Sequence, residues 1–466
     1  MVFSSLLFVF LFLTLNLVCY YSVKTIRQKN IVLLVFSLIF YAWGGAAYLL
    51  LLAGMAFWSW LCALMIEKKQ NKKSGLILMW ISVAVSLSFL LIFKYADFLI
   101  ENVNQLPGVS LPLSKLSLPI GISFYTFQII SYTVDVWRGD TKAQRNIISF
   151  GTYVSLFPQL IAGPIVRYTD IERELQERKH SVTLAASGIQ RFLIGLSKKV
   201  LIANVLGELT DICLKTSQPS ILSWWMYAAA LVLQIYFDFS GYSDMAIGLG
   251  RIFGFQFPEN FNYPLISRSV KEFWRRWHIS LGRWFRDYVY IPLGGSRVST
   301  PKCIRNLLIV WVLTGLWHGA SWTFVAWGLY HGILLLLEKY PLKGILAKTP
   351  SPIRHILTLL AVIVGWVLFF SPDFSSAIFY LGRMSGAGSR AFWDSTAKYY
   401  FAANWKLLVL GILGCGPWIR TLYRHLVFSR RSPGLVLSAL LLIGIFLLCV
   451  PYMTNATYQS FLYVQF

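Results

Sequence analysis

Long apolar runs recur along almost the whole chain and are separated by short polar or basic stretches. An α-helix rises 1.5 Å per residue, so about 20 apolar residues are needed to cross a hydrocarbon layer about 30 Å thick. Runs of this kind continue from the first residues to about residue 450. The pattern predicts an all-α, polytopic membrane protein with about 10 to 12 spans, together with re-entrant and interfacial helices.

The order of apolar runs and basic blocks predicts how the first spans are oriented. Residues 1–21 lack a basic leading region and a small-residue cleavage site, so we expect a retained first span. Residues 31–66 are too long for one span and contain a break at Gly44, which predicts two. Basic residues follow at 68–73, and basic loops mark the cytoplasmic side. We therefore expect the amino end and the loop at 101–118 to lie outside.

Two later segments are apolar but irregular. Residues 147–161 are followed at once by an Ala-Gly-Pro break, which predicts a re-entrant or buried piece. Residues 189–206 are interrupted by Lys198 and Lys199. That pattern predicts either a poor span or an interfacial helix whose lysines extend their charged ends to the surface.

Composition supports the membrane class and changes how the charge is interpreted. The 466 residues are 57% hydrophobic and only 13% charged, which excludes a soluble domain of this size. A net charge of +23 would suggest a nucleic-acid partner in a soluble chain. Here the basic residues lie in short loops between apolar runs, so we expect contacts with anionic lipid and no nucleic acid. The six cysteines are scattered without a CxxC pair, which favours small apolar residues.

Two histidines in apolar surroundings are the first candidates for chemistry. A charged group in the hydrocarbon layer costs about 2.5–3.5 kcal/mol, so an ionisable residue there is functional by default. An imidazole, with a pKa of about 6.5, can stay neutral and still exchange a proton. We therefore expect His318 to be a general base and His278 its partner. The alternatives are a packed core histidine for His318 and, for His278, an interfacial histidine that is hydrogen-bonded to a carbonyl. For His331 the core alternative is preferred.

The neighbours of these histidines give two further expectations. Small residues near His318, such as Gly315 and Ser321, predict room for a narrow substrate beside its ring. Residues 271–288 show aromatic residues on one stripe of a helix and basic residues away from it, which predicts a single interfacial helix with His278 at the border of the two faces. The arginines of that helix, which can hold lipid headgroups, are Arg275, Arg276 and Arg283.

Polar residues within the apolar run at 224–255 need partners. Asp238 and Asp244 are costly there unless they are hydrogen-bonded, ion-paired with an arginine such as Arg251, or in contact with water. A structural polar cluster is the simpler interpretation. The chain has no His-x3-His spacing near His278 and His318 and no G-x-S-x-G motif. We therefore expect no metal, and a reacting hydroxyl that comes from the substrate.

Several motifs together resemble the membrane-bound O-acyltransferase family. They are PIGISFYTFQIISY at 119–132, FPQLIAGP at 157–164, FDFSGYSDMAIG at 237–248, FWRRWHISLGRWFRDYVYIPLGG at 273–295 and GLWHG at 315–319. The YIPLGG ending and the terminal QSFLYVQF are more similar to the alginate and peptidoglycan O-acetylation branch than to the teichoic acid D-alanyl branch.

The resemblance implies a fold, a site and partners. The fold would be one membrane domain, a ring of tilted helices around a central funnel or tunnel, with amino-terminal spans at 1–117, a catalytic core at 118–340 and carboxyl-terminal spans at 341–466. His318 corresponds to the catalytic histidine and His278 to the second histidine. The expected substrate-binding residues are Trp274, Trp277, Arg275, Arg276, Arg283, Ser321, Asp238 and Tyr242.

The activity implied is transfer of acetyl from cytoplasmic acetyl-CoA, without a bound cofactor, for O-acetylation of an extracytoplasmic polysaccharide. The expected location is the cytoplasmic membrane, and the expected partner is an SGNH hydrolase-like acetyltransferase outside. Two alternatives stay open. One is transfer of D-alanine from a carrier protein to teichoic acid, and the other is a non-catalytic protein for polysaccharide export or scaffolding.

Overall fold

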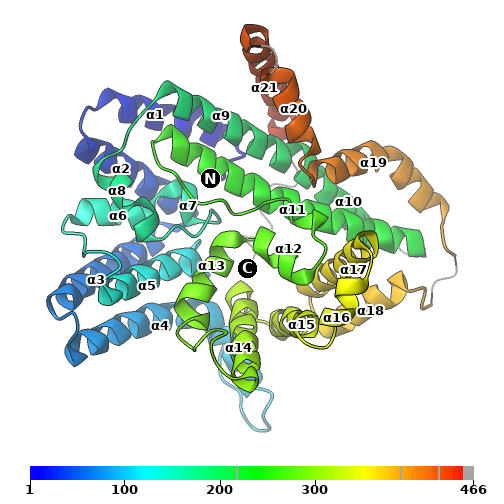
Figure 1. Cartoon of the computed structure of the whole chain (residues 1–466), viewed down its shortest axis with the longest axis horizontal. Coiled ribbons are helices and arrows are strands. Elements are labelled where there is room, and N and C mark those ends of the chain that lie inside the picture. Colours follow the sequence, from blue (N-terminus) through cyan, green and yellow to red (C-terminus); the bar gives the residue numbers. More distant parts are fainter. Residues whose placement is uncertain (217–218, 389–390, 429–430, 455–466) are drawn as a thin grey trace. The chain divides into compact units, whose positions relative to one another are not determined.

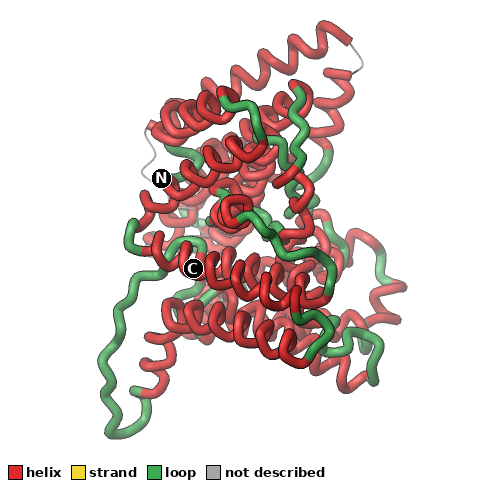
Figure 2. The backbone as a smooth tube through the Cα atoms, turned by 90° about the vertical axis from the view of Figure 1, so that its left-hand side faces the viewer, coloured by secondary structure: helices red, strands yellow, loops and turns green. Residues whose placement is uncertain are grey.

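The computed structural model describes residues 1–216, 219–388, 391–428 and 431–454. Within these ranges the chain forms helices and loops and no strand (Figure 2). The expected all-α class is therefore confirmed. The QSFLYVQF motif at 459–466 lies outside the described residues.

The chain folds into two compact units, which are described separately. The first unit holds residues 1–192 and 243–258, and the second holds residues 193–242 and 259–466. Two helices have one part in each unit. They are α9 (Val182–Ser197), divided after residue 192, and α11 (Ile221–Ile252), divided after residue 242. The expected division at residues 117 and 340 stays a prediction.

The first unit begins with a π-helix and continues through long apolar helices and short ones. In α3, α4 and α5 it has three helices that lie side by side (Figure 1). Its elements are η1 (Leu7–Phe12), α1 (Leu13–Ser22), α2 (Ile26–Gly45), α3 (Tyr48–Lys68), α4 (Lys73–Val103), α5 (Ile122–Arg138), α6 (Ile147–Ser155), α7 (Phe157–Leu160) and α8 (Tyr168–Gln176). The break after Gly45 and the broken segment at 147–161 are both as expected.

The second unit combines long helices with several short, broken ones. Its elements are η2 (Lys198–Ala203), α10 (Asn204–Lys215), η3 (Pro264–Ile266), α12 (Val270–Arg276), α13 (Ile279–Phe285), η4 (Arg286–Tyr290), α14 (Thr300–His318), α15 (Trp322–Lys339), α16 (Lys343–Lys348), α17 (Ser351–Phe370), α18 (Phe374–Met384), α19 (Ser395–Gly414), α20 (Trp418–Phe428) and α21 (Arg431–Thr454). α14 and α15 form a tight helical hairpin. A Cβ at Gly315 would lie 2.2 Å from the carbonyl oxygen of Phe324, and one at Gly328 would lie 2.2 Å from that of Trp311.

The expected single helix at 271–288 is wrong. The structure has two short helices, and the break between them falls at His278, which has a left-handed backbone with φ of 45°. The physical reason is a competing backbone partner. The Asn262 N–H donates to the Arg276 carbonyl at 2.9 Å, and the Ile279 N–H donates to the Asn260 carbonyl at 2.9 Å. These bonds take groups that a continuous helix would have used.

Among the described residues, six helices are long and apolar enough to cross a membrane, or seven if the bent pair α19 and α20 counts as one span. The six are Ile26–Gly45, Tyr48–Lys68, Lys73–Val103, Ile221–Ile252, Ser351–Phe370 and Pro433–Thr454. This number is below the expected 10 to 12 because several other apolar segments are short or broken. The protein is a multi-pass membrane protein.

The lysine-interrupted segment at 189–206 also differs from expectation. It is a continuous helical stretch with a π-helical part, η2, that carries both lysines. The Lys199 side chain does not reach the surface, because it is 1% exposed and its Nζ lies 2.5 Å from the Asp238 carboxylate. Asp244 pairs with Arg191 at 2.8 Å. The two carboxylates thus have partners from the α9 and η2 stretch.

Candidate active site

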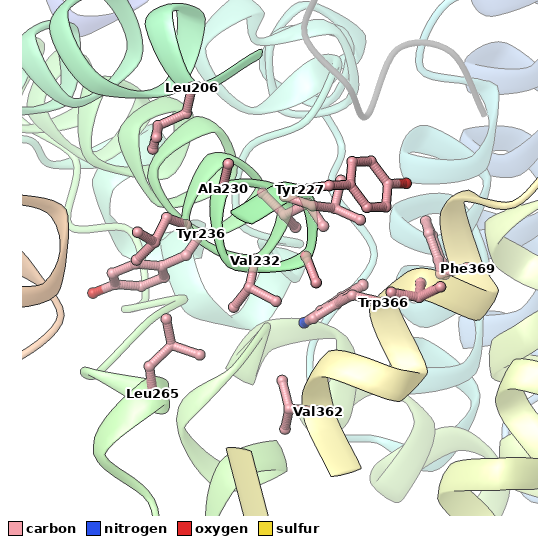
Figure 3. Packing of buried hydrophobic residues seen from close by; sticks show 14 of the residues in the cluster. Leu206, Tyr227, Ala230, Val232, Tyr236, Leu265, Val362, Trp366 and Phe369 are labelled. Carbon is pink, nitrogen blue, oxygen red and sulfur yellow. The ribbon is translucent and has the colours of Figure 1, made fainter. Parts of the chain in front are cut away.

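An aromatic cluster of the second unit surrounds the candidate histidines. Buried residues of α11, α12, α15 and α17 belong to one hydrophobic cluster. Figure 3 shows Trp366 of α17 beside Val232 of α11, with Phe369 of α17 on the far side of Trp366. Phe369 also contacts the ring of His318, with centroids 5.4 Å apart. The candidate site is therefore built into the packed core of this unit.

His278 occupies the strained break between α12 and α13 and is 2% exposed. A non-glycine residue with positive φ costs on the order of 1–3 kcal/mol, and such strain is concentrated at functional sites. The ring meets Phe239 edge-on at 4.8 Å between centroids and Trp317 at 5.9 Å. The break thus turns His278 toward α11 and the end of α14.

Asn260 determines which nitrogen of His278 carries a proton. The Oδ1 atom of Asn260 accepts from the Ser280 N–H at 3.3 Å and from the Ser280 hydroxyl at 2.9 Å, and His278 Nδ1 lies 3.1 Å from the same atom. An amide oxygen can only accept hydrogen bonds, so Nδ1 must be the donor. In the neutral ring, Nε2 is then the proton-accepting nitrogen.

His318 is the last residue of α14. Its ring also carries the proton on Nδ1, but there the acceptor is a backbone carbonyl. Its Nδ1 lies 2.7 Å from the carbonyl oxygen of Thr314, which can only accept. Nε2 is again the proton-accepting nitrogen of the neutral ring. The His318 ring is 5% exposed and is enclosed by Trp317 and Trp327, with centroids at 5.0 and 4.9 Å, besides Phe369. Its surroundings are therefore mostly aromatic.

The structure brings the two histidines together, although 39 residues separate them in the sequence. His318 lies close enough to His278 to interact with it electrostatically. Trp317 contacts both rings. Two imidazoles of the same tautomer, with the proton on Nδ1, therefore lie in one buried site. Such a pair is able to accept and return a proton.

Gly315 and Gly319, near His318, lie against Phe324 of α15. A Cβ on Gly315 would meet the Phe324 carbonyl at 2.2 Å, and one on Gly319 would meet the Phe324 ring at 2.1 Å. These glycines therefore serve the close approach of α14 and α15. Ser321 caps α15, since its hydroxyl accepts from the Thr323 N–H at 3.3 Å.

Three other predicted residues pack in the core or near it. The Trp274 indole N–H donates to His331 Nδ1 at 3.3 Å, and Trp311 contacts the Trp274 ring at 4.6 Å between centroids. Trp277 packs against Phe273 and Trp366. His331 is 2% exposed, which agrees with the core role expected for it.

The predicted arginines differ in exposure. Arg275 is exposed, and Arg283 is half-buried. Arg276 pairs with Glu272 at 2.9 Å and donates to the Asn262 carbonyl at 3.1 Å, so it also holds the loop that carries Asn260. Arg275 is therefore the arginine of this group that is presented to solvent.

Asp238 and Tyr242 are buried one turn apart on α11. Asp238 pairs with Lys199 and precedes Phe239, the residue that contacts His278. Sequence reasoning missed Asn260 and Lys199. The burial of Lys199 would have pointed to its pairing with Asp238, but that burial is visible only in the fold. In the part of the chain that the structure describes, no group of three or more His, Cys, Asp or Glu residues is arranged to hold a metal ion.

Comparison with known proteins is consistent with this geometry. Residues 113–379 match the model of the membrane-bound O-acyltransferase family. The probable alginate O-acetylase AlgI of Pseudomonas aeruginosa is 46% identical over 380 residues, which cover 79% of this chain and 72% of that protein. The probable alginate O-acetylase AlgI of Pseudomonas putida is 39% identical over the full length of both chains.

A relative that acts on another polymer is more distant. The peptidoglycan O-acetyltransferase of Helicobacter pylori is 33% identical over 421 residues, with 83% of this chain and 80% of that protein covered. The matched region contains both histidines, Asn260 and the aromatic cluster around them. The chain therefore belongs to the membrane-bound O-acyltransferase family and is an acyltransferase.

Proposed function

We propose that this protein takes acetyl from cytoplasmic acetyl-CoA for O-acetylation of an extracytoplasmic polysaccharide, with His318 as general base and His278 as its partner. The names of the relatives support acetyl as the group transferred and an alginate-like or peptidoglycan-like polymer as the acceptor. The observation that carries the assignment of roles is the shared tautomer. In each ring Nδ1 donates to an oxygen, which leaves Nε2 to accept a proton.

The proposed reaction uses that nitrogen. His318 Nε2 takes the proton of an acceptor hydroxyl as the hydroxyl oxygen attacks the thioester carbonyl carbon. The carbon–sulfur bond then breaks, and the imidazolium gives the proton to the leaving thiolate of coenzyme A. General base catalysis of this kind contributes roughly 10²–10⁴-fold to the rate. The rings of Trp317, Trp327 and Phe369 around His318 limit the access of water that would hydrolyse the thioester.

The partners follow from the same proposal. The protein lies in the cytoplasmic membrane, and an SGNH hydrolase-like enzyme outside completes the transfer to the polymer. Arg275, being exposed, contacts phosphates of coenzyme A or anionic lipid headgroups at the cytoplasmic side. The tilted-helix ring and its tunnel would bring the donor and the acceptor to the histidines from opposite sides.

The test is substitution of the histidines in membranes that contain the full-length protein. His318→Ala should lower the release of coenzyme A from labelled acetyl-CoA by about 10²–10⁴-fold at normal membrane abundance, and His278→Ala should lower it less. His425→Ala, which changes an exposed histidine, is the matched control. Undiminished acetylation of the polymer with His318→Ala would contradict the proposed role.

The donor needs its own measurement. Purified protein should bind radiolabelled acetyl-CoA, and unlabelled coenzyme A should displace it. If the protein fails to bind acetyl-CoA and copurifies with a loaded carrier protein, the D-alanyl alternative is supported. If export of the polymer depends on the protein while His318→Ala has no effect, the non-catalytic alternative is supported.

A further inference from the structure

A cluster of cationic side chains surrounds the buried hydroxyl of Tyr20 in the first unit. Tyr20 lies near the end of α1, Lys29 near the start of α2, and Arg178 and His180 follow α8. The Arg178 Nε donates to the Tyr20 oxygen at 3.1 Å, and His180 Nε2 lies 2.8 Å from it. The Lys29 Nζ lies 5.0 Å from the centre of the Tyr20 ring. We call Tyr20, Lys29, Arg178 and His180 the basic cluster.

The hydrogen bonds of Tyr20 show that this residue adds no negative charge. Its hydroxyl donates its one proton to the Phe253 carbonyl at 2.7 Å. The oxygen must therefore accept from both Arg178 and His180, so His180 Nε2 carries a proton. Tyr20 thus joins Arg178 and His180 without adding a negative charge.

Positive charge is in excess in the basic cluster. Across the described ranges, no carboxylate lies within 4.0 Å of the charged atoms of Lys29, Arg178 or His180. Glu174 acts on Arg178 only at longer range and through its backbone carbonyl. Burial lowers the pKa of His180, and the charges of Lys29 and Arg178 lower it further. Lys29 also lies in the first turn of α2, where the helix dipole disfavours a cation.

One donor of the basic cluster has no partner among the residues that the structure describes. Arg178 is 6% exposed, and its Nη2 atom makes no hydrogen bond to the described residues. Its Nη1 donates to the Glu174 carbonyl at 3.1 Å, and its guanidinium lies 4.4 Å from the centre of the Phe255 ring. A buried donor on a charged group is costly when it is unpaired. Excess charge and an unused donor in one place are the features of a site for an anion.

We propose that the basic cluster binds one phosphate group, supplied by an anionic phospholipid or by a soluble phosphate compound. Phosphate oxygens accept charge-assisted hydrogen bonds from arginine and lysine, and the negative charge offsets the mutual repulsion of Lys29 and Arg178. The place in the chain favours the lipid. Lys29 lies at the first turn of a candidate span, and basic pockets between helices on the cytoplasmic side are typical sites for anionic headgroups.

The experiment compares Lys29→Gln with Lys24→Gln in the full-length protein. Lys24 is exposed and five residues away, so it controls for the same change in charge outside the basic cluster. Native mass spectrometry in detergent would measure binding of phosphatidylglycerol, with phosphatidylcholine as the uncharged reference. Lys29→Gln should weaken binding of phosphatidylglycerol about tenfold, and Lys24→Gln should change it less than twofold. Lys29→Arg should retain binding.

Inorganic pyrophosphate distinguishes the two sources. If millimolar pyrophosphate binds to the wild-type protein and phosphatidylglycerol does not, the site takes a soluble phosphate. If Lys29→Gln fails to fold, the preference of the wild-type protein for phosphatidylglycerol over phosphatidylcholine still decides the question. Equal retention of both lipids without binding of pyrophosphate would overturn the proposal, as would equal losses in the Lys24 and Lys29 variants.

Discussion

The buried ion pair between Lys199 and Asp238 allows a quantitative prediction. Their side chains are 1% and 3% exposed, with the Nζ and Oδ1 atoms 2.5 Å apart. Asp238→Asn removes the charge of the partner but leaves the Lys199 ammonium in a place that water does not reach. Breaking one side of a buried pair costs about 3–5 kcal/mol, because the remaining charge is not compensated. Total stabilities are about 5–15 kcal/mol, so Asp238→Asn should remove a large part of the free energy of unfolding.

Comparison of single and double variants tests the cause. Lys199→Met should cost a similar amount, since it leaves the Asp238 carboxylate buried. Lys199→Met with Asp238→Leu should cost much less than the sum of the single changes, with a coupling free energy of about 2–4 kcal/mol, because both charges of the buried pair are then removed. Thermal or denaturant unfolding of the protein purified in detergent would measure these differences.

The matched control is the second ion pair of the same helix. The side chains of Arg191 and Asp244 are 19% and 15% exposed, and their charged atoms lie 2.8 Å apart. Because this pair is partly hydrated, we expect a coupling of roughly 1 kcal/mol or less between Arg191→Gln and Asp244→Asn. If the effects of Lys199→Met and Asp238→Leu are additive, or if their coupling is no larger than that of the control pair, the reasoning is refuted.

Two further predictions concern the site and the hairpin. Asn260→Ala removes the acceptor of His278 Nδ1, so acetyl transfer should fall by roughly 10–100-fold, whereas Asn260→Asp keeps an acceptor and should retain more activity. The release of coenzyme A per folded molecule measures this difference, and equal activities of the two variants would contradict it. Gly315→Ala places a Cβ 2.2 Å from the Phe324 carbonyl and should destabilise the protein by about 1–3 kcal/mol. Gly344→Ala, which meets no heavy atom within 4 Å, should not, and equal melting temperatures of the two variants would show that the hairpin tolerates the change.

Local patterns were most reliable where one segment decides its own structure. Long apolar runs must form helices in a membrane, because no water is present there to satisfy the backbone, and the breaks after Gly45 and after α7 follow from residues at those positions. The family motifs likewise identified His278 and His318 before any geometry was available. The prediction of one helix along 271–288 was wrong. The helical spacing of its aromatic residues does not reveal that the 260–262 segment forms hydrogen bonds with the same backbone groups.

The sequence by itself thus determined the all-helical membrane class and the acyltransferase family, and it gave two candidate histidines, since each depends on residues that are adjacent or that recur in a recognisable motif. Only the tertiary structure decided the tautomer of His278, the burial of Lys199 against Asp238 and the use of Gly315 for helix packing. Each of these depends on an atom from another segment of the chain. Hydrogen bonds and ion pairs act over about 3 Å, so they are settled only when the fold brings such atoms together.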